Sequence, residues 1–176
     1  LTSIAAFLQA NGDQPLAEVA EARALQGDVL REQGRFPAAI AAYREYLSRH
    51  PAHGLWERVQ QAIVDTEFAL ANAAYAGPKP DFALARERFA QFAAAYPLDA
   101  RNPQLLYELG EMLLQEKKFD EAREAFARCV AKYPGKEASS RAQLEIGRIF
   151  ETRTFNYEAA LSAYRAVEGP YTRQAM

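Results

Sequence analysis

Apolar residues recur along this chain at steps of three and four residues, with polar and charged residues between them. That is the period of an amphipathic α-helix, whose apolar residues share one face. Clusters containing Pro and Gly, such as "NGDQP", "AGPKP" and "YPGK", interrupt the pattern at short intervals. No segment alternates strictly in the manner of a strand. The pattern therefore predicts an all-α protein, with helices near residues 1–10, 15–33, 36–49, 54–76, 81–95, 103–116, 119–132, 137–153 and 157–168.

One helical pattern occurs four times. An aromatic residue is followed by Ala at +3, by apolar residues at +7 and +10, and by Pro at +15. Offsets 3, 7 and 10 share one helix face, and the proline stops the helix because the residue before it disfavours helical geometry. The copies are Phe36, Ala39, Tyr43, Tyr46, Pro51; Phe82, Ala85, Phe89, Phe92, Pro97; Phe119, Ala122, Phe126, Cys129, Pro134; and Tyr157, Ala160, Tyr164, Val167, the last breaking off early at Pro170.

A second helix precedes each copy and carries a small residue at a fixed place. Gly27, Gly110 and Gly147 occupy this place, with Ala73 in the second copy. It lies 12 residues before the small Ala in the first three copies and 13 before it in the last. A glycine inside a helix costs about 1 kcal/mol relative to Ala, so its recurrence predicts close helix–helix contact. We expect the small residue of the first helix to face the small Ala of the second helix across each helical hairpin, with Gly110 opposite Ala122.

This combination of Gly or Ala, Ala, two apolar or aromatic places and Pro resembles the tetratricopeptide repeat. The resemblance implies a right-handed α-solenoid of stacked antiparallel helical hairpins with about nine helices. We expect a single domain over residues 1–176, with residues 1–12 as the second helix of a truncated preceding repeat. The expected repeats are 15–51, 54–97, 103–134 and 137–168. The first aromatic residues are 46, 37 and 38 residues apart, and the long first step predicts an extended helix over 54–76.

Composition and charge narrow the function. The hydrophobic fraction of 49% and the charged fraction of 25% are those of an ordinary globular protein. The net charge of −2 and the interspersed acids argue against a nucleic-acid partner. No apolar run is long enough to insert into a bilayer. The chain begins at Leu1 without a signal-peptide pattern, so we expect a piece of something longer.

Candidate chemistry is sparse. His50 and His53, in "RHPAHG", are too few for a metal site. Cys129 occupies a place on the apolar stripe and is expected to be a buried hydrophobe rather than a reactive thiol. No phosphate-binding loop, HExxH or GxSxG motif is present. The sequence therefore predicts no enzyme, no cofactor and no metal.

The family resemblance points to a concave groove lined by the first helix of each hairpin. In that family, ligand contacts come from the second, fifth, ninth and twelfth residues of this helix, counting the Gly place as the eighth. The lysine and asparagine that chaperone-tail receptors carry at the fifth and ninth places are absent. Tyr107 and Arg148 are the expected exposed binding residues, for a segment with an apolar anchor and an acidic group. The candidate groove residues are Asp28, Arg31, Leu70, Tyr107, Glu111, Leu114, Arg141 and Arg148.

The sequence thus predicts a noncatalytic protein-interaction scaffold with a protein or peptide in its groove. "FAQFAAAYPLDARNPQLLYELGEMLL" resembles bacterial envelope repeats such as those of Tol–Pal accessory proteins, which slightly favours the periplasm. "FNYEAALSAYRAVEGPYTRQAM" resembles helical repeats of bacterial alpha-2-macroglobulin-like protease traps, where the chain would be a structural spacer or N-terminal extension. We also expect weak self-association through the truncated ends, at Leu1, Ile4, Leu8, Leu161 and Tyr164.

Overall fold

The computed structural model describes residues 2–14 and 16–174 and contains only helices and connecting turns in that part of the chain. The all-α fold class is confirmed, and the predicted helices match the observed ones to within a few residues at most ends. A final 3₁₀ helix was not predicted. The elements are α1 (Thr2–Asn11), α2 (Ala17–Glu32), α3 (Phe36–Arg49), α4 (Trp56–Ala76), α5 (Phe82–Ala95), α6 (Asn102–Gln115), α7 (Phe119–Lys132), α8 (Glu137–Thr152), α9 (Tyr157–Arg165) and η1 (Gly169–Gln174).

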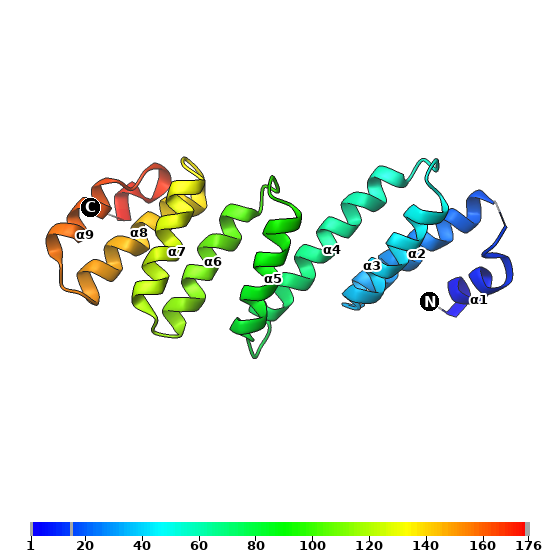
Figure 1. Cartoon of the computed structure of the whole chain (residues 1–176), viewed down its shortest axis with the longest axis horizontal. Coiled ribbons are helices and arrows are strands. Elements are labelled where there is room, and N and C mark those ends of the chain that lie inside the picture. The colour runs from blue at the N-terminus through cyan, green and yellow to red at the C-terminus, as the bar shows by residue number, and fades with distance from the viewer. Residues whose placement is uncertain (1, 15, 175–176) are drawn as a thin grey trace. The chain divides into compact units, whose positions relative to one another are not determined.

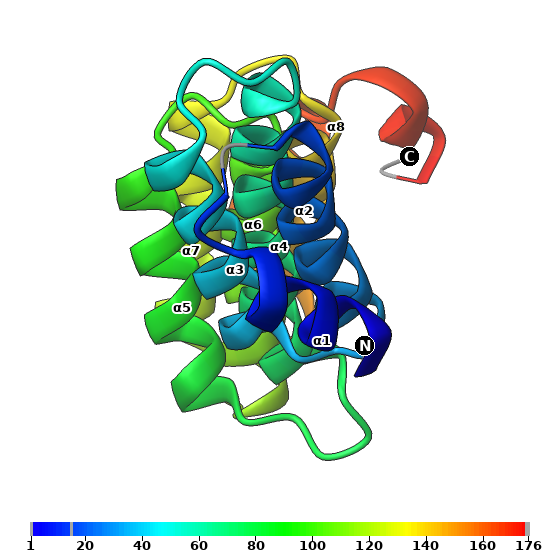
Figure 2. The ribbon, with the colours of Figure 1, turned by 90° about the vertical axis from the view of Figure 1, so that its right-hand side faces the viewer.

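The chain divides into two compact units, Leu1–Tyr96 and Pro97–Met176. In the first unit each helix packs against the next along the chain, from α1 to α5 (Figure 1). Figure 2 shows α2 and α4 on one side of this unit and α3 and α5 on the other. Its core is built from the stripe residues of α3 and from small or branched residues of α2 and α4: Ala20, Ala24, Leu30, Ala39, Ile40, Ala42, Tyr43, Tyr46, Val59, Ala62 and Ile63.

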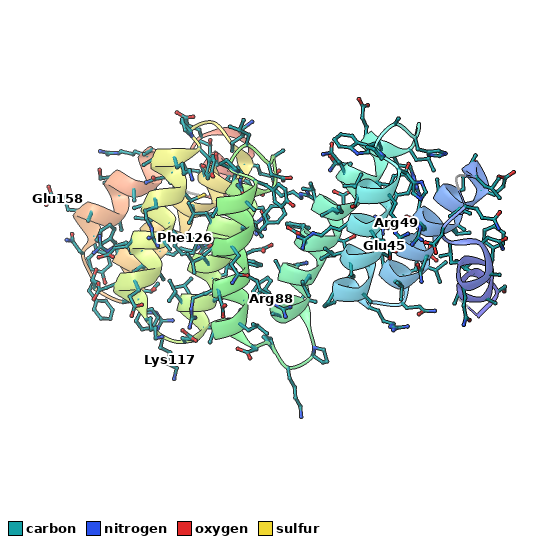
Figure 3. All side chains as sticks on the ribbon, turned by 45° about the vertical axis from the view of Figure 1, so that its right-hand side comes forward. Glu45, Arg49, Arg88, Lys117, Phe126 and Glu158 are labelled. Carbon is teal, nitrogen blue, oxygen red and sulfur yellow. The ribbon has the colours of Figure 1, made fainter. Side chains whose placement is uncertain are left out.

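The second unit contains two helical hairpins, α6–α7 and α8–α9 (Figure 1). Helix α7 packs against α8, α6 also contacts α8, and η1 lies against α8. The core of this unit centres on Phe126, labelled in Figure 3, which has no exposed surface. Ala122 and Cys129, its stripe neighbours, are also fully buried. Helical hairpins packed in sequence are therefore present in both units, whereas the single four-repeat array stays a prediction.

The helix crossing at the glycine place differs from the prediction that small faces small. A Cβ atom built on Gly110 would lie 2.3 Å from Cε1 of Phe126. The same distance separates such an atom on Gly27 from Cε1 of Tyr43, and one on Gly147 from Cε1 of Tyr164. Each glycine thus receives the aromatic ring at +7 of the following helix, not the Ala at +3. The two positions share a face but are one turn apart, so helical periodicity alone did not separate them.

Helix α4 departs from the register predicted for its repeat. Ala73, placed by sequence comparison at the glycine position, is exposed, whereas Ala71 is only 2% exposed. Positions 71 and 73 are about 200° apart around the helix axis, so the buried face of α4 is nearly opposite to the one that was predicted. This 21-residue helix packs on one neighbour with each half. Val59 in its first half joins the core shared with α3, and Phe68 in its second half contacts the ring of Phe92 on α5 at 5.5 Å.

The turns inside three hairpins share a left-handed residue two positions before the first aromatic residue. Gly34, Lys117 and Phe155 hold φ values of 71°, 61° and 53°. In the second of these turns the N–H of Lys118 donates to the carbonyl of Leu113 at 2.8 Å, which satisfies a carbonyl at the end of α6. Only glycine adopts this conformation without a steric cost from Cβ. Lys117 and Phe155 therefore carry backbone strain that Gly34 avoids.

The residues expected at truncated ends differ in exposure. Leu161 is 49% exposed on α9. Ile4 and Leu8 on α1 are half-buried, as is Tyr164, whose ring covers Gly147. Leu1 lies outside the described residues. Self-association through these residues stays a prediction.

We expect Gly110→Ala to destabilise the protein by about 1–3 kcal/mol, because its Cβ would overlap the Phe126 ring. Helix propensity alone would favour Ala by about 1 kcal/mol, so the two effects have opposite signs. Thermal unfolding followed by circular dichroism measures the net result. Gly54→Ala is the control, since no atom lies within 4 Å of a Cβ there. An unchanged or raised Tm for Gly110→Ala would contradict the ring-on-glycine contact.

We expect Lys117→Gly to stabilise the protein by about 0.5–1 kcal/mol, because glycine removes the Cβ strain of the left-handed turn. Lys117 is at the α6–α7 turn (Figure 3). The matched control is Lys118→Gly, where φ is −91° and glycine only adds freedom to the unfolded chain. Chemical denaturation of both variants should shift the midpoint in opposite directions. A lower midpoint for Lys117→Gly would show that the turn is not strained.

Candidate functional site

His53 and Cys129 lie in structural contacts, whereas His50 packs against the ring of Tyr46 and its buried Nε2 makes no hydrogen bond within the described residues. Nδ1 of His53 lies 2.8 Å from the hydroxyl oxygen of Tyr46. Burial, and then the neighbouring Arg23, lower the pKa of His50. Sγ of the fully buried Cys129 donates to the carbonyl of Pro103 at 3.4 Å, and burial raises its thiol pKa, so the thiolate is disfavoured. Within residues 2–14 and 16–174 no group of three or more His, Cys, Asp or Glu side chains is placed to hold a metal ion.

In the first unit, the groove candidate Asp28 is already engaged. The hydroxyl of Tyr43 donates to its Oδ1 at 2.7 Å, and the guanidinium of Arg58 donates to its Oδ2. Burial and the Asp28 hydrogen bond together raise the pKa of Tyr43. Asp28 therefore ties α2 to both α3 and α4. Arg31, one turn further along α2, is half-buried beside this group.

Leu70 does not lie with Asp28 and Arg31. It is half-buried, packs against the core of the first unit, and lines a groove between α3, α4 and α5. Leu70 was assigned to the expected groove by counting from Ala73 as the equivalent of the repeat glycine. That equivalence is wrong for α4, because Ala73 is exposed. Comparison of the repeats could not show that the buried face of α4 is rotated from the predicted one, because a helix lengthened at its start keeps the same helical period.

Tyr107 is not the exposed anchor that the sequence predicted. Only 5% of it is exposed. Its ring lies 5.5 Å from the ring of Phe126 and 4.1 Å beneath the guanidinium of Arg141. Ala24 and Leu144, at the same fifth place of α2 and α8, are buried as well. The fifth place is thus a core position in these three helices. Tyr107 thus supports the guanidinium of Arg141 from below and contributes little to the protein surface.

The remaining candidates of the second unit lie on two helices that contact each other, and we call this surface the α6/α8 face: Gln104, Glu108, Glu111 and Leu114 of α6, and Arg141, Glu145 and Arg148 of α8. Glu111 and Leu114 are half-buried, whereas the side chain of Arg148 is 50% exposed. Arg148 donates to Oε1 of Glu145 at 2.5 Å. Nη1 of Arg141 lies 3.5 Å from Oε1 of Gln104, which links the two helices.

Glu111 differs from Asp28, although both occupy the ninth place of a first helix. Asp28 is held by the hydroxyl of Tyr43, the ring that covers Gly27. The ring that covers Gly110 belongs to Phe126, which has no hydroxyl to donate. No hydrogen bond or ion pair is made by Glu111 within the described part of the chain. One missing oxygen atom thus leaves a carboxylate unengaged on the α6/α8 face.

Two further carboxylates, Glu108 and Glu145, were missed from the sequence. Burial raises the pKa of both, and the charge of Glu111 raises each further. Oε1 of Glu108 accepts from Gln104 at 2.9 Å, while its Oε2 is buried and accepts no hydrogen bond. The available signal was that Glu stands two residues before Gly110 and again two before Gly147. Three carboxylates and two arginines thus gather on the α6/α8 face.

We expect Glu108→Gln to raise the Tm at neutral pH. The folded-state pKa of Glu108 lies above that of the unfolded chain, so the folded protein binds more protons and the free energy of unfolding falls as pH rises through that range. An uncharged Gln removes this loss. Melting curves between about pH 4 and pH 7 should show a flatter fall for Glu108→Gln than for wild type. Glu124→Gln, at an exposed position past the first turn of α7, is the control and should leave the melting curves unchanged. A lower neutral-pH Tm would mean that the carboxylate is stabilising.

None of the helices in the described residues has the length and apolar character needed to cross a membrane.

The comparisons with known proteins agree with the repeat pattern. A comparison with curated proteins gives no match. A comparison with protein families matches the family described as "Tetratricopeptide repeat" over residues 1–53 and 68–137, which is more than half of the chain. The stretch between those segments covers the first part of α4, where the helix is extended. The chain belongs to the tetratricopeptide repeat family.

Proposed function

We propose that this chain is a noncatalytic scaffold that binds a segment of a partner protein on the α6/α8 face. Tetratricopeptide repeat proteins generally mediate protein–protein interactions and are usually noncatalytic. The observation that carries the proposal is the unengaged carboxylate of Glu111, half-buried between Glu108, Glu145 and the apolar Leu114. A half-buried charge that lacks a hydrogen-bonded or ion-paired partner costs free energy, which a ligand of opposite charge recovers.

The chemistry of the face indicates which ligand fits. Three carboxylates outnumber two arginines, and Arg148 is already paired with Glu145. The partner segment therefore carries a cationic side chain that meets Glu111 and an apolar side chain beside Leu114. This proposal replaces the acidic ligand that the sequence favoured, because that ligand depended on Tyr107 being an exposed neighbour of a free Arg148.

The first test is a charge reversal. Proteins retained from a lysate by the wild-type chain are identified, and the affinity of the purified partner is then measured for Glu111→Lys and Glu121→Lys. Glu111→Lys should weaken binding by at least about 1 kcal/mol. Glu121→Lys makes the same charge change on the exposed surface of α7 and should leave affinity unchanged. Equal binding by both variants would remove the α6/α8 face from the proposal.

A second variant tests the same carboxylate without altering its charge. Phe126→Tyr adds the hydroxyl that Tyr43 uses to hold Asp28. The added hydroxyl should donate to Glu111 and compete with the partner, lowering affinity while leaving the fold intact. Tyr107→Ala is unsuitable as a binding test, because Tyr107 is a core residue and its truncation costs about 3 kcal/mol or more of stability.

The cellular setting is a separate hypothesis. The bacterial envelope, with the periplasm favoured, and the alternative role as a spacer or N-terminal extension of an alpha-2-macroglobulin-like trap are supported only by the sequence resemblances given above. Fractionation of cells that express the natural protein tests the compartment. Failure of the wild-type chain to retain any protein would favour the spacer role.

A further inference from the structure

A second surface, in the first unit, has the form of a binding groove. It lies between α3, α4 and α5 and has a volume of about 400 Å³. Its floor and walls are mainly apolar and are provided by Pro37, Ile40, Leu70, Ala71, Phe92 and Ala95. Ile40 belongs to the core of the first unit and Leu70 packs against that core, so the floor is held by packing from beneath. A groove with a fixed apolar floor suits a side chain of a partner segment.

Charged side chains stand on the rim of this groove. Arg44 donates to Oε1 of Glu67 at 2.8 Å, and the hydroxyl of Tyr96 donates to Oε2 of the same carboxylate at 2.8 Å. Both oxygens of Glu67 are therefore occupied, and burial together with this hydrogen bond raises the pKa of Tyr96 to about 12. Arg88, labelled in Figure 3, uses Nη1 to donate to the backbone carbonyl of Leu70 at 2.8 Å.

The rim has a surplus of positive charge. Two guanidinium groups face one carboxylate, and the bond from Arg88 goes to an uncharged carbonyl. The side chain of Arg44 is 66% exposed even though it is paired with Glu67. A guanidinium has five N–H donors and binds a carboxylate through two of them. Arg44 thus retains donors for a second carboxylate without giving up Glu67.

We propose that this groove binds a second protein segment, one that places an apolar side chain on the floor and a carboxylate against Arg44. Arg88 adds positive potential and fixes the position of the floor through Leu70. The proposal concerns different helices and the opposite ligand charge from the α6/α8 face, so it does not depend on the function proposed above. It gives the chain two binding surfaces, one for a basic segment and one for an acidic segment.

The experiment uses designed peptides and the whole chain. One set of peptides carries a Leu-Phe pair with Glu placed one, three or four residues away, and the matched set carries Lys at the same places. Each is titrated into isotopically labelled protein, and amide chemical shifts are followed by NMR. We expect at least one acidic peptide to shift the amides of residues 37–44 and 88–95, with the matched lysine peptide binding about fivefold or more weakly. Equal shifts from both sets, or none at millimolar peptide, would overturn the proposal.

Two pairs of variants locate the contact. Arg44→Glu should weaken the acidic peptide by about fivefold or more, and Arg128→Glu, the same change on the exposed surface of α7, should not. Ala95→Phe fills the groove from an exposed position and should block binding, whereas Ala94→Phe, its exposed neighbour outside the lining, should not. Melting curves confirm that these surface variants fold. Unchanged affinity in Ala95→Phe would exclude the groove as the binding site.

Discussion

The contact on which the hairpins depend is an aromatic ring lying against a glycine that has no side chain. It occurs at Gly27 with Tyr43, at Gly110 with Phe126 and at Gly147 with Tyr164. The ring excludes any Cβ, and so it accounts for three glycines inside helices whose propensity disfavours them. The contact also sets how close the two helices of a hairpin come. In α2, α6 and α8, the helices that carry these glycines, the fifth place is buried, and Tyr107 lies there in α6.

The tip of the same ring influences the charged surface of the first helix. The hydroxyl of Tyr43 reaches Asp28, and the hydroxyl of Tyr164 reaches Glu151 at 2.6 Å. Burial and the hydrogen bond to Glu151 raise the pKa of Tyr164 to about 12, so both tyrosines stay protonated donors near neutral pH. Phe126 packs in the same way but leaves Glu111 unengaged. The difference between a structural acid and a candidate binding acid is therefore one hydroxyl on the opposite helix.

In the first unit, one hairpin lacks the glycine contact and packs differently. Helix α4 has no glycine at the expected place and packs with two neighbours in a register that exposes Ala73 and buries Ala71. Rings of α4 and α5 meet edge-on instead, with Tyr75 and Phe89 at 6.1 Å. Leu70 then lies on the side facing α3 and α5, where a groove with an arginine-rich rim is present. One irregular helix thus turns Leu70 toward the second helices α3 and α5, which supply most of the groove lining, and away from the expected concave groove.

The sequence by itself determined the helices, their order and the family. The apolar period, the proline stops and the recurring Gly, Ala and aromatic pattern are local or repeated signals, and together they indicate paired helices of this family. It did not determine which residues of one helix face are covered by the next. Tyr107 was expected to be exposed, Leu70 was assigned to the wrong side of α4, and Glu108 and Glu145 were overlooked. Burial, pairing and pKa depend on atoms from other helices, at distances that side-chain packing sets. The helical period tells which face of its own helix a side chain lies on. Only the tertiary structure shows which neighbouring helix covers that face, and at what distance.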